Sequence, residues 1–293
     1  MMLVPDVAFA PLIRLTGVKR MFQDPAKTRR RMDKRAIRPL SFNPPRMRSD
    51  VTISATRVDG VPVYTVAPQG RPSTGHVIYT HGGAWVGEIV SAHWRFIEEL
   101  VATRGVTATV PIYALVPFGT AQQANDLVLG LYDEASRSGQ DVTLAGDSAG
   151  GQIALSAALT LRDRGVKDVR TVLIAPALDL TFANPEIEDV KPHDPWLSNE
   201  GPPVLADVWR GDLSITDPIV SPLFGDMHGL GPMLVVSGTR DITNPDTHLL
   251  VDKARAAGVS VRFVERHEAL HVFPLLPTPS GRADRARLVQ AFP

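Results

Sequence analysis

The sequence predicts an α/β protein with a mixed, mostly parallel sheet of about eight strands flanked by helices. Two observations carry this prediction. From residue 76 onward, apolar segments of strand length alternate with longer segments of helical periodicity, which is typical of parallel strands joined by helical crossovers. Before them, two segments of alternating apolar and polar residues flank Asp59-Gly60, which is typical of an antiparallel hairpin.

The hairpin comprises residues 51–58 and 61–66, and Asp-Gly suits its turn because both central residues of a type I′ turn need a positive φ. The expected buried strands are short and rich in β-branched or aromatic residues; they are 76–80, 106–113, 142–145, 169–175, 233–237 and 259–264. The expected helices carry apolar residues at helical spacing; they are 91–104, 121–138, 152–164, 247–257 and 282–291.

Two segments do not fit this alternation. Residues 1–48 precede the first strand, and residues 179–231 separate two core strands and are rich in Pro, Gly and Asp. A connection this long inside a domain is usually a functional insertion, so we expect both segments to form a cap over the same end of the sheet. The stretch 19–48 is basic, and we interpret its run Arg29-Arg30-Arg31 as a solvated helix face.

Composition limits the possible functions. The chain has 293 residues, of which 44% are apolar, and we expect one domain that spans residues 1–293. Its formal net charge of +0 does not suggest a nucleic-acid partner, and the lack of cysteine excludes disulfides and thiolate metal sites. Residues 1–10 do not resemble a signal peptide, and no segment reaches the ~18 apolar residues of a spanning helix. We therefore expect a cytoplasmic protein without a stable membrane anchor.

The first candidate catalytic residue is Ser148, in the run Gly146-Asp147-Ser148-Ala149-Gly150. This pattern alone is weak, but here it lies between an expected strand and an expected helix. A nucleophilic serine requires that strand–turn–helix context, and small neighbours allow the sharp turn to close. The N-terminus of the following helix also favours negative charge at the reacting centre.

A second motif, His81-Gly82-Gly83-Ala84-Trp85, follows the expected strand 76–80. Glycines allow a loop to aim its backbone N–H groups at a developing oxyanion. We expect the N–H groups of Gly83, Ala84 and Ala149 to form an oxyanion hole, with Gly82 as a weaker candidate. We interpret His81 as a residue that orders this loop.

The base should be a histidine held by a carboxylate, and both should follow the serine in the chain. Asp241 lies in the loop after the expected strand 233–237, and Asp246 is its rival but suits the start of the next helix better. His271 and His267 both follow the last expected strand. We prefer His271 because a longer loop would let it return over the end of the sheet.

These motifs resemble the hormone-sensitive-lipase-like family of α/β-hydrolase esterases. His-Gly-Gly-Ala-Trp paired with Gly-Asp-Ser-Ala-Gly-Gly carries the resemblance, and the run 113–117, Asp126 and the segment 217–223 agree with it. It covers roughly residues 50–293. Two departures are Ala84, where the family has a third glycine, and the run 113–118, which lacks the family's Arg and ends in Pro-Phe. Neither removes a catalytic group.

The resemblance implies an α/β-hydrolase fold and a serine carboxylesterase for short- to medium-chain acyl esters. Catalysis would proceed through a Ser148-His271-Asp241 triad and an acyl-enzyme, without metal or cofactor. An amidase, formamidase or thioesterase with the same triad is an alternative, as is a non-catalytic ligand receptor. Small-molecule esters would be the substrates, and the edge strand 259–264 would permit a homodimer.

Four aromatic residues are candidates for an acyl pocket, although each also suits packing in the core or the cap; they are Phe22, Trp85, Trp196 and Trp209.

Overall fold

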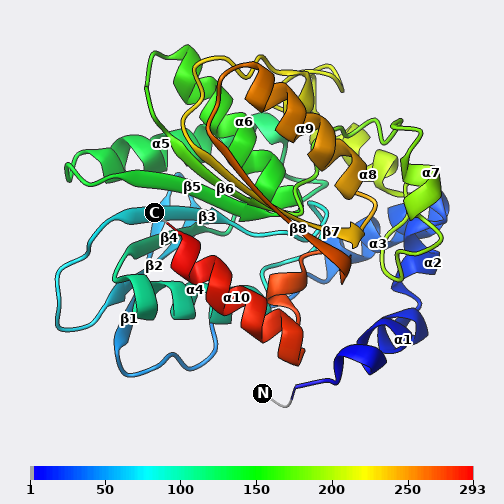
Figure 1. The fold of residues 1–293 in the computed structure, drawn as a ribbon, viewed down its shortest axis with the longest axis horizontal. Coiled ribbons are helices and arrows are strands. Elements are labelled where there is room, and N and C mark those ends of the chain that lie inside the picture. The colour runs from blue at the N-terminus through cyan, green and yellow to red at the C-terminus, as the bar shows by residue number, and fades with distance from the viewer. Residues whose placement is uncertain (1–2, 293) are drawn as a thin grey trace.

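The computed structural model describes residues 3–292 and confirms the predicted mixed sheet (Figure 1). Its eight strands lie in the order β1-β2-β4-β3-β5-β6-β7-β8, and all neighbours from β4 to β8 are parallel. The strands are β1 (Val51–Val58), β2 (Val61–Pro68), β3 (His76–Thr80), β4 (Thr107–Pro111), β5 (Val142–Asp147), β6 (Arg170–Ile174), β7 (Met233–Arg240) and β8 (Val261–Leu270). Residues 1, 2 and 293 of the expected single domain lie outside the described residues, and its extent stays a prediction.

The predicted hairpin is confirmed at one edge of the sheet. β1 pairs antiparallel with β2, and β2 pairs antiparallel with β4. Asp59 and Gly60 join the two strands with φ values of 49° and 82°, as a tight turn of this kind requires. At the other edge, β8 pairs with β7 on one side, and the homodimer proposed for this edge stays a prediction.

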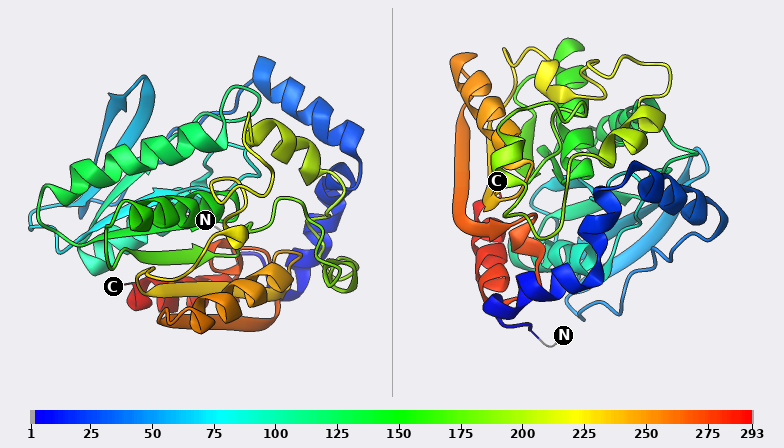
Figure 2. Two further views of the ribbon diagram at one scale, coloured as in Figure 1. Left: turned by 90° about the horizontal axis from the view of Figure 1, so that it is seen from above. Right: turned by 90° about the vertical axis from the view of Figure 1, so that its right-hand side faces the viewer.

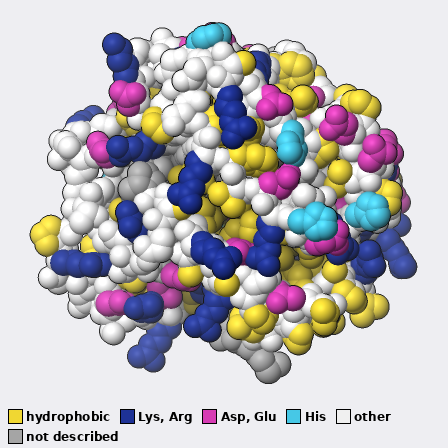
Figure 3. Space-filling view, in the orientation of Figure 1, with side chains coloured by type: hydrophobic (Ala, Val, Ile, Leu, Met, Phe, Trp, Pro, Cys, Tyr) yellow, Lys and Arg dark blue, Asp and Glu magenta, His cyan; other side chains and the backbone are white. Residues whose placement is uncertain are grey.

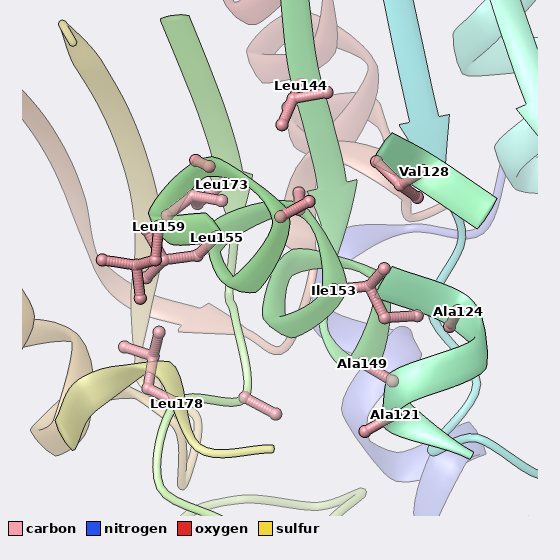
Figure 4. Packing of buried hydrophobic residues seen from close by; sticks show 14 of the residues in the cluster. Ala121, Ala124, Val128, Leu144, Ala149, Ile153, Leu155, Leu159, Leu173 and Leu178 are labelled. Atoms are coloured by element: carbon pink, nitrogen blue, oxygen red, sulfur yellow. The ribbon is translucent and has the colours of Figure 1, made fainter. Parts of the chain in front are cut away.

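Helices cover both faces of the sheet, as the alternation of strands and helices along the chain predicts. Ile78, Leu144 and Leu173 contribute to one hydrophobic cluster, which is completed by α5, α6 and α9. Figure 4 shows Leu144 and Leu173 with the side chains of α5 and α6. The neighbours of Ile78, Leu144 and Leu173 along the strands point to the opposite face, where α4 and α10 complete a second cluster. The helices are α4 (Ser91–Arg104), α5 (Ala121–Ser136), α6 (Ala149–Asp163), α9 (Asn244–Ala256) and α10 (Pro279–Ala291).

The expected end of the last strand is wrong. Pairing between β7 and β8 passes an irregularity at Gly238/Arg240 and continues to Leu270, six residues beyond position 264. This half of β8 has exposed polar residues such as Glu265 and His267, so the sequence lacks the apolar pattern of a buried strand. The longer loop that we expected before His271 is therefore strand.

The helices of the two segments outside the alternation lie at the carboxyl ends of the parallel strands (Figures 1 and 2). The two segments contribute α1 (Asp6–Thr16), α2 (Val18–Phe22), α3 (Pro25–Ile37), α7 (Ile187–Val190), α8 (Pro202–Trp209) and the short turn η1 (Pro222–Phe224). The last part of the insertion returns beside the end of α6, where Arg162 donates to His228 O at 3.0 Å. A second short turn, η2 (Phe273–Leu275), follows β8. α3 packs against α8, and the N–H of Gly201 donates to Phe22 O at 2.6 Å. Lys19 Nζ also donates to the carbonyl oxygens of Lys191 and Asp194, both at 2.5 Å.

Within residues 3–292, no helix combines the length and the apolar character needed to cross a membrane.

A close approach between α6 and β3 fixes the turn that carries Ser148. A Cβ added at Gly150 would lie 2.0 Å from Thr80 O, and one added at Gly146 would lie 2.3 Å from Gly150 O. Real side chains cannot occupy such positions, so both glycines are needed for the helix to begin directly against the strand.

We expect Gly150→Ala to lower the free energy of unfolding by about 1–3 kcal/mol, although alanine favours helices, because its methyl group would collide with the backbone of β3. Gly130→Ala in α5 is the matched control, since a Cβ at Gly130 meets nothing within 4 Å. The control should be neutral or stabilising by up to about 1 kcal/mol in urea unfolding. Equal stabilities of the two variants would contradict this packing.

Candidate active site

Ser148 occupies the turn between β5 and α6, in a strained conformation with φ 52° and ψ −119°. Its N–H donates to Ile174 O at 2.9 Å, and its carbonyl accepts from Ala177 N at 3.0 Å, so the neighbouring strand holds the turn on both sides. A non-glycine residue at positive φ needs such support. The side chain is half-buried and therefore within reach of a ligand.

The structure brings His271 and Asp241 to this serine. His271 Nε2 lies 2.9 Å from Ser148 Oγ, and His271 Nδ1 lies 2.7 Å from Asp241 Oδ2. Since a carboxylate only accepts, Nδ1 carries the proton and Nε2 accepts from the serine hydroxyl. Asp241 is fully buried, and its second oxygen accepts from Thr243 N at 3.0 Å. The three side chains follow β5, β7 and β8, whose carboxyl ends meet at one edge of the sheet.

The rival residues lie elsewhere. Asp246 is buried in α9, where it accepts from Asn184 Nδ2 at 2.8 Å, and burial raises its pKa to about 6. His267 lies within β8 with its side chain 87% exposed, so it faces solvent. In the part of the chain that the structure describes, neither residue forms a hydrogen bond with Ser148 or His271.

A second carboxylate close to His271 and Asp241, that of Asp194, was not predicted from the sequence. It is buried in the insertion, and its Oδ2 accepts from Ile242 N at 3.1 Å, directly after Asp241. Its Oδ1 accepts from the N–H groups of Trp196 and Leu197, at 2.7 and 2.9 Å. Burial and the nearby charge of Asp241 raise the pKa of Asp194 to about 6. The side chain therefore ties the insertion to the loop that carries Asp241.

The electrostatics favour a histidine that can hold a proton. Burial lowers the pKa of His271, but the charge and hydrogen bond of Asp241 outweigh burial. Asp194 adds to the same effect, and the pKa of His271 lies above its ordinary value. Trp196 packs edge-on against the imidazole, with ring centroids 6.0 Å apart. It has no signal in the sequence that distinguishes it from a packing residue.

The expected oxyanion-hole residues lie in the loop after β3 and at the start of α6, and one of the four does not fit the role. Gly83 and Ala84 have positive φ values of 137° and 53°. Within residues 3–292, their N–H groups donate no hydrogen bond. Ala149 is the first residue of α6, where N–H groups have no partner inside the helix. Gly82 does not fit the role, because its N–H already donates to Asp147 Oδ1 at 3.0 Å.

The side chain of Asp147 holds this loop in place through hydrogen bonds. It is buried, and its Oδ1 also accepts from Tyr79 Oη at 2.6 Å. Its Oδ2 lies 3.2 Å from His93 Nε2. Because His93 Nδ1 accepts a hydrogen bond from Val90 N, the ring proton is on Nε2, which donates to Asp147 Oδ2. Burial raises the pKa of Asp147, but the interaction with His93 and the hydrogen bonds from Tyr79 and Gly82 outweigh burial and hold this pKa below its ordinary value.

His81 orders the loop, as expected. Its Nδ1 lies 2.7 Å from Gly82 O, and its ring stacks on Tyr113 with centroids 4.6 Å apart. Tyr113 Oη donates to His81 O at 2.7 Å, so the run that departs from the family pattern still contacts the loop. Burial lowers the pKa of His81 to about 4, and it is uncharged at neutral pH.

The candidate aromatic residues divide by position. Trp85 and Trp209 are buried, and both indole N–H groups donate to Gln152 Oε1 at 3.0 Å. Phe22, the last residue of α2, is buried in the first hydrophobic cluster. Trp196 is half-buried and contacts His271, so it is the candidate that lies beside the hydrogen-bonded Ser148 and His271.

A hydroxyl that donates to a carboxylate-bound histidine can lose its proton while it attacks an electrophilic carbon. The free N–H groups nearby can stabilise the oxyanion that results. Among the residues that the structure describes, no group of three or more His, Asp or Glu side chains could hold a metal ion.

Comparisons with known proteins agree with this geometry. The sequence model of a family described as "alpha/beta hydrolase fold" matches residues 77–275, more than half of the chain. A triacylglycerol lipase of Mycobacterium tuberculosis is 30% identical over 281 residues, and the match spans 92% of this chain and 60% of that lipase. An esterase of Acinetobacter venetianus is 29% identical over 73% of this chain and 72% of its own length.

The fold is also shared with solved structures. A hormone-sensitive lipase from a metagenome library superimposes with a TM-score of 0.80 at 23% identity, and the match covers 99% of this chain and 98% of that one. The resemblance drawn from the sequence motifs is confirmed. The chain belongs to the family of proteins with the α/β-hydrolase fold.

Proposed function

We propose that the protein is a serine carboxylesterase. The observation that supports this most directly is the relay in which Ser148 donates to His271 and His271 donates to Asp241. Relatives named as a lipase and an esterase support the same reaction class. By resemblance, the substrates are uncharged esters with short or medium acyl chains.

The reaction has two steps. Ser148 Oγ attacks the ester carbonyl carbon while its proton passes to His271 Nε2, and Asp241 stabilises the imidazolium. The N–H groups of Gly83, Ala84 and Ala149 stabilise the oxyanion. The C–O bond to the alcohol then breaks, and His271 returns the proton to the departing oxygen.

The acyl group is left on Ser148. Water attacks this acyl-enzyme, His271 accepts the water's proton, and collapse of the second tetrahedral intermediate releases the acid and restores the serine hydroxyl.

The segments 1–48 and 179–231 form the cap of this site in the proposal. Their helices pack on each other at the carboxyl ends of the strands, and Asp194 connects them to the loop of Asp241. The cap would shape the space for the acyl and alcohol groups, with Trp196 beside His271.

Ser148→Ala and His271→Ala are each expected to lower kcat for p-nitrophenyl butyrate by about a thousand-fold or more, because each removes a member of one concerted unit. His267→Ala is the matched control and should stay close to wild type, since that side chain faces solvent. Hydrolysis followed at constant pH measures all three. Equal activity of wild type and Ser148→Ala would refute the proposal, and turnover of an anilide or thioester with no ester turnover would redirect it to those substrates.

The pH profile tests the electrostatics. His271 must be neutral to accept a proton, so kcat/KM should rise with pH through a pKa above that of ordinary histidine. The carboxylates that face His271 are Asp241, Asp194 and Asp147. Asp194→Asn removes one raising charge, so the acid limb should move to lower pH. Asp189→Asn removes an exposed carboxylate of the same insertion and should not move it. An unmoved limb in both variants would contradict the role given to Asp194.

A further inference from the structure

The N-terminal segment carries an excess of positive charge that the rest of the chain balances. Residues 1–48 contain twelve Lys and Arg but only three Asp and no Glu, whereas the whole chain has a net charge of +0. Most of these basic side chains are exposed to solvent: Arg14, Arg20, Lys27, Arg29, Arg30, Lys34, Arg38, Arg46 and Arg48. The excess is therefore concentrated on the surface of one segment.

The same segment exposes large apolar side chains. α1 is apolar on two faces: Phe9 and Ile13 point into the protein, while Val7, Pro11 and Leu15 recur every four residues on the outer face. Val7 is 88% exposed and Leu15 is 83% exposed. Leu12 in α1, Ile37 at the end of α3 (81%) and Leu40 are also exposed. Packing inside the monomer explains the inner face of α1 and leaves the outer face unexplained.

The charged and apolar groups belong to one region of the molecule. The right panel of Figure 2 shows α1, α2 and α3 in blue, together on the side turned to the viewer. In Figure 3, apolar side chains gather at the lower right, where Figure 1 places α1, and basic side chains lie at the right margin, near α2 and α3.

We propose that the segment 1–48 docks the protein reversibly on an anionic lipid surface. An amphipathic helix can bury apolar side chains at the boundary between headgroups and acyl chains, while nearby Lys and Arg are attracted to anionic headgroups. Val7, Leu12 and Leu15 would enter the boundary, and the exposed arginines of α2 and α3 would contact headgroups.

The charge argues against other occupants. A two-fold contact between copies of this chain would place the same basic segment against itself, and like charges would oppose association. A nucleic acid would satisfy the arginines but would leave the outer face of α1 in water. An anionic lipid surface satisfies both kinds of group.

The docking surface lies at the end of the sheet where Ser148 is found. If the chain is an esterase, which is the proposal on which this point rests, docking would bring the site close to esters dissolved in a lipid layer. Binding itself needs no catalysis and is testable alone.

Flotation with lipid vesicles tests the proposal. The full chain should bind vesicles of phosphatidylcholine with one third phosphatidylglycerol more tightly than vesicles of phosphatidylcholine alone, and binding should weaken as salt rises. Arg29→Gln with Arg30→Gln should weaken binding to the anionic vesicles by about ten-fold or more. Val7→Ser with Leu15→Ser should weaken it by about ten-fold.

Matched controls are available outside the segment 1–48. Arg164→Gln with Lys167→Gln removes two exposed charges between α6 and β6, and Leu249→Ser removes an exposed leucine of α9; both should bind as wild type does. Ser148→Ala should bind vesicles although it loses hydrolysis, which separates this proposal from the proposed activity. Equal loss in controls and test variants would overturn the proposal. So would equal binding to both vesicle types, tighter binding to duplex DNA, or a dimer that Val7→Ser with Leu15→Ser abolishes.

Discussion

The buried carboxylate of Asp147 is the constraint on which the geometry of the site depends. It accepts from Tyr79 in β3, from Gly82 in the following loop and from His93 in α4, while its own backbone leads directly into Ser148. A buried charge is tolerated only when several donors surround it. Because all of these donors must be present, the loop with Gly83 and Ala84 and the turn with Ser148 have one relative position.

The insertion is held to the sheet by polar groups of the same kind. Gln152 in α6 accepts from the indoles of Trp85 and Trp209, and its amide nitrogen donates to Ile219 O at 2.7 Å. On the other side of the site, Asp194 accepts from Ile242 N. The insertion is thus hydrogen-bonded to α6, which begins directly after Ser148, and to the loop that carries Asp241.

Much of the fold was predictable, because buried parallel strands leave a strong apolar pattern and glycines mark the sharp turns. Ser148 was predictable for the same reason: steric limits at Gly146 and Gly150 restrict which residues are allowed. Asp194 was not predictable, since its partner Ile242 N is far away in the sequence and the insertion lacks periodicity. The prediction that Gly82 contributes to the oxyanion hole was wrong, because a sequence does not show that its N–H donates to the carboxylate of Asp147, 65 residues away. The end of β8 was missed because an edge strand carries polar residues.

The outer face of α1 illustrates a further limit of periodicity. Apolar residues at helical spacing usually mark the face that packs inward, and Phe9 and Ile13 follow that rule. Val7 and Leu15 have the same spacing but face solvent, and only the structure separates the two sets. The side chains around Ser148, at the carboxyl ends of the strands, are buried and hydrogen-bonded to one another. The N-terminal segment has no such requirement on its outer side, so exposed charge and apolar surface persist there, where contact with a partner surface would make them favourable.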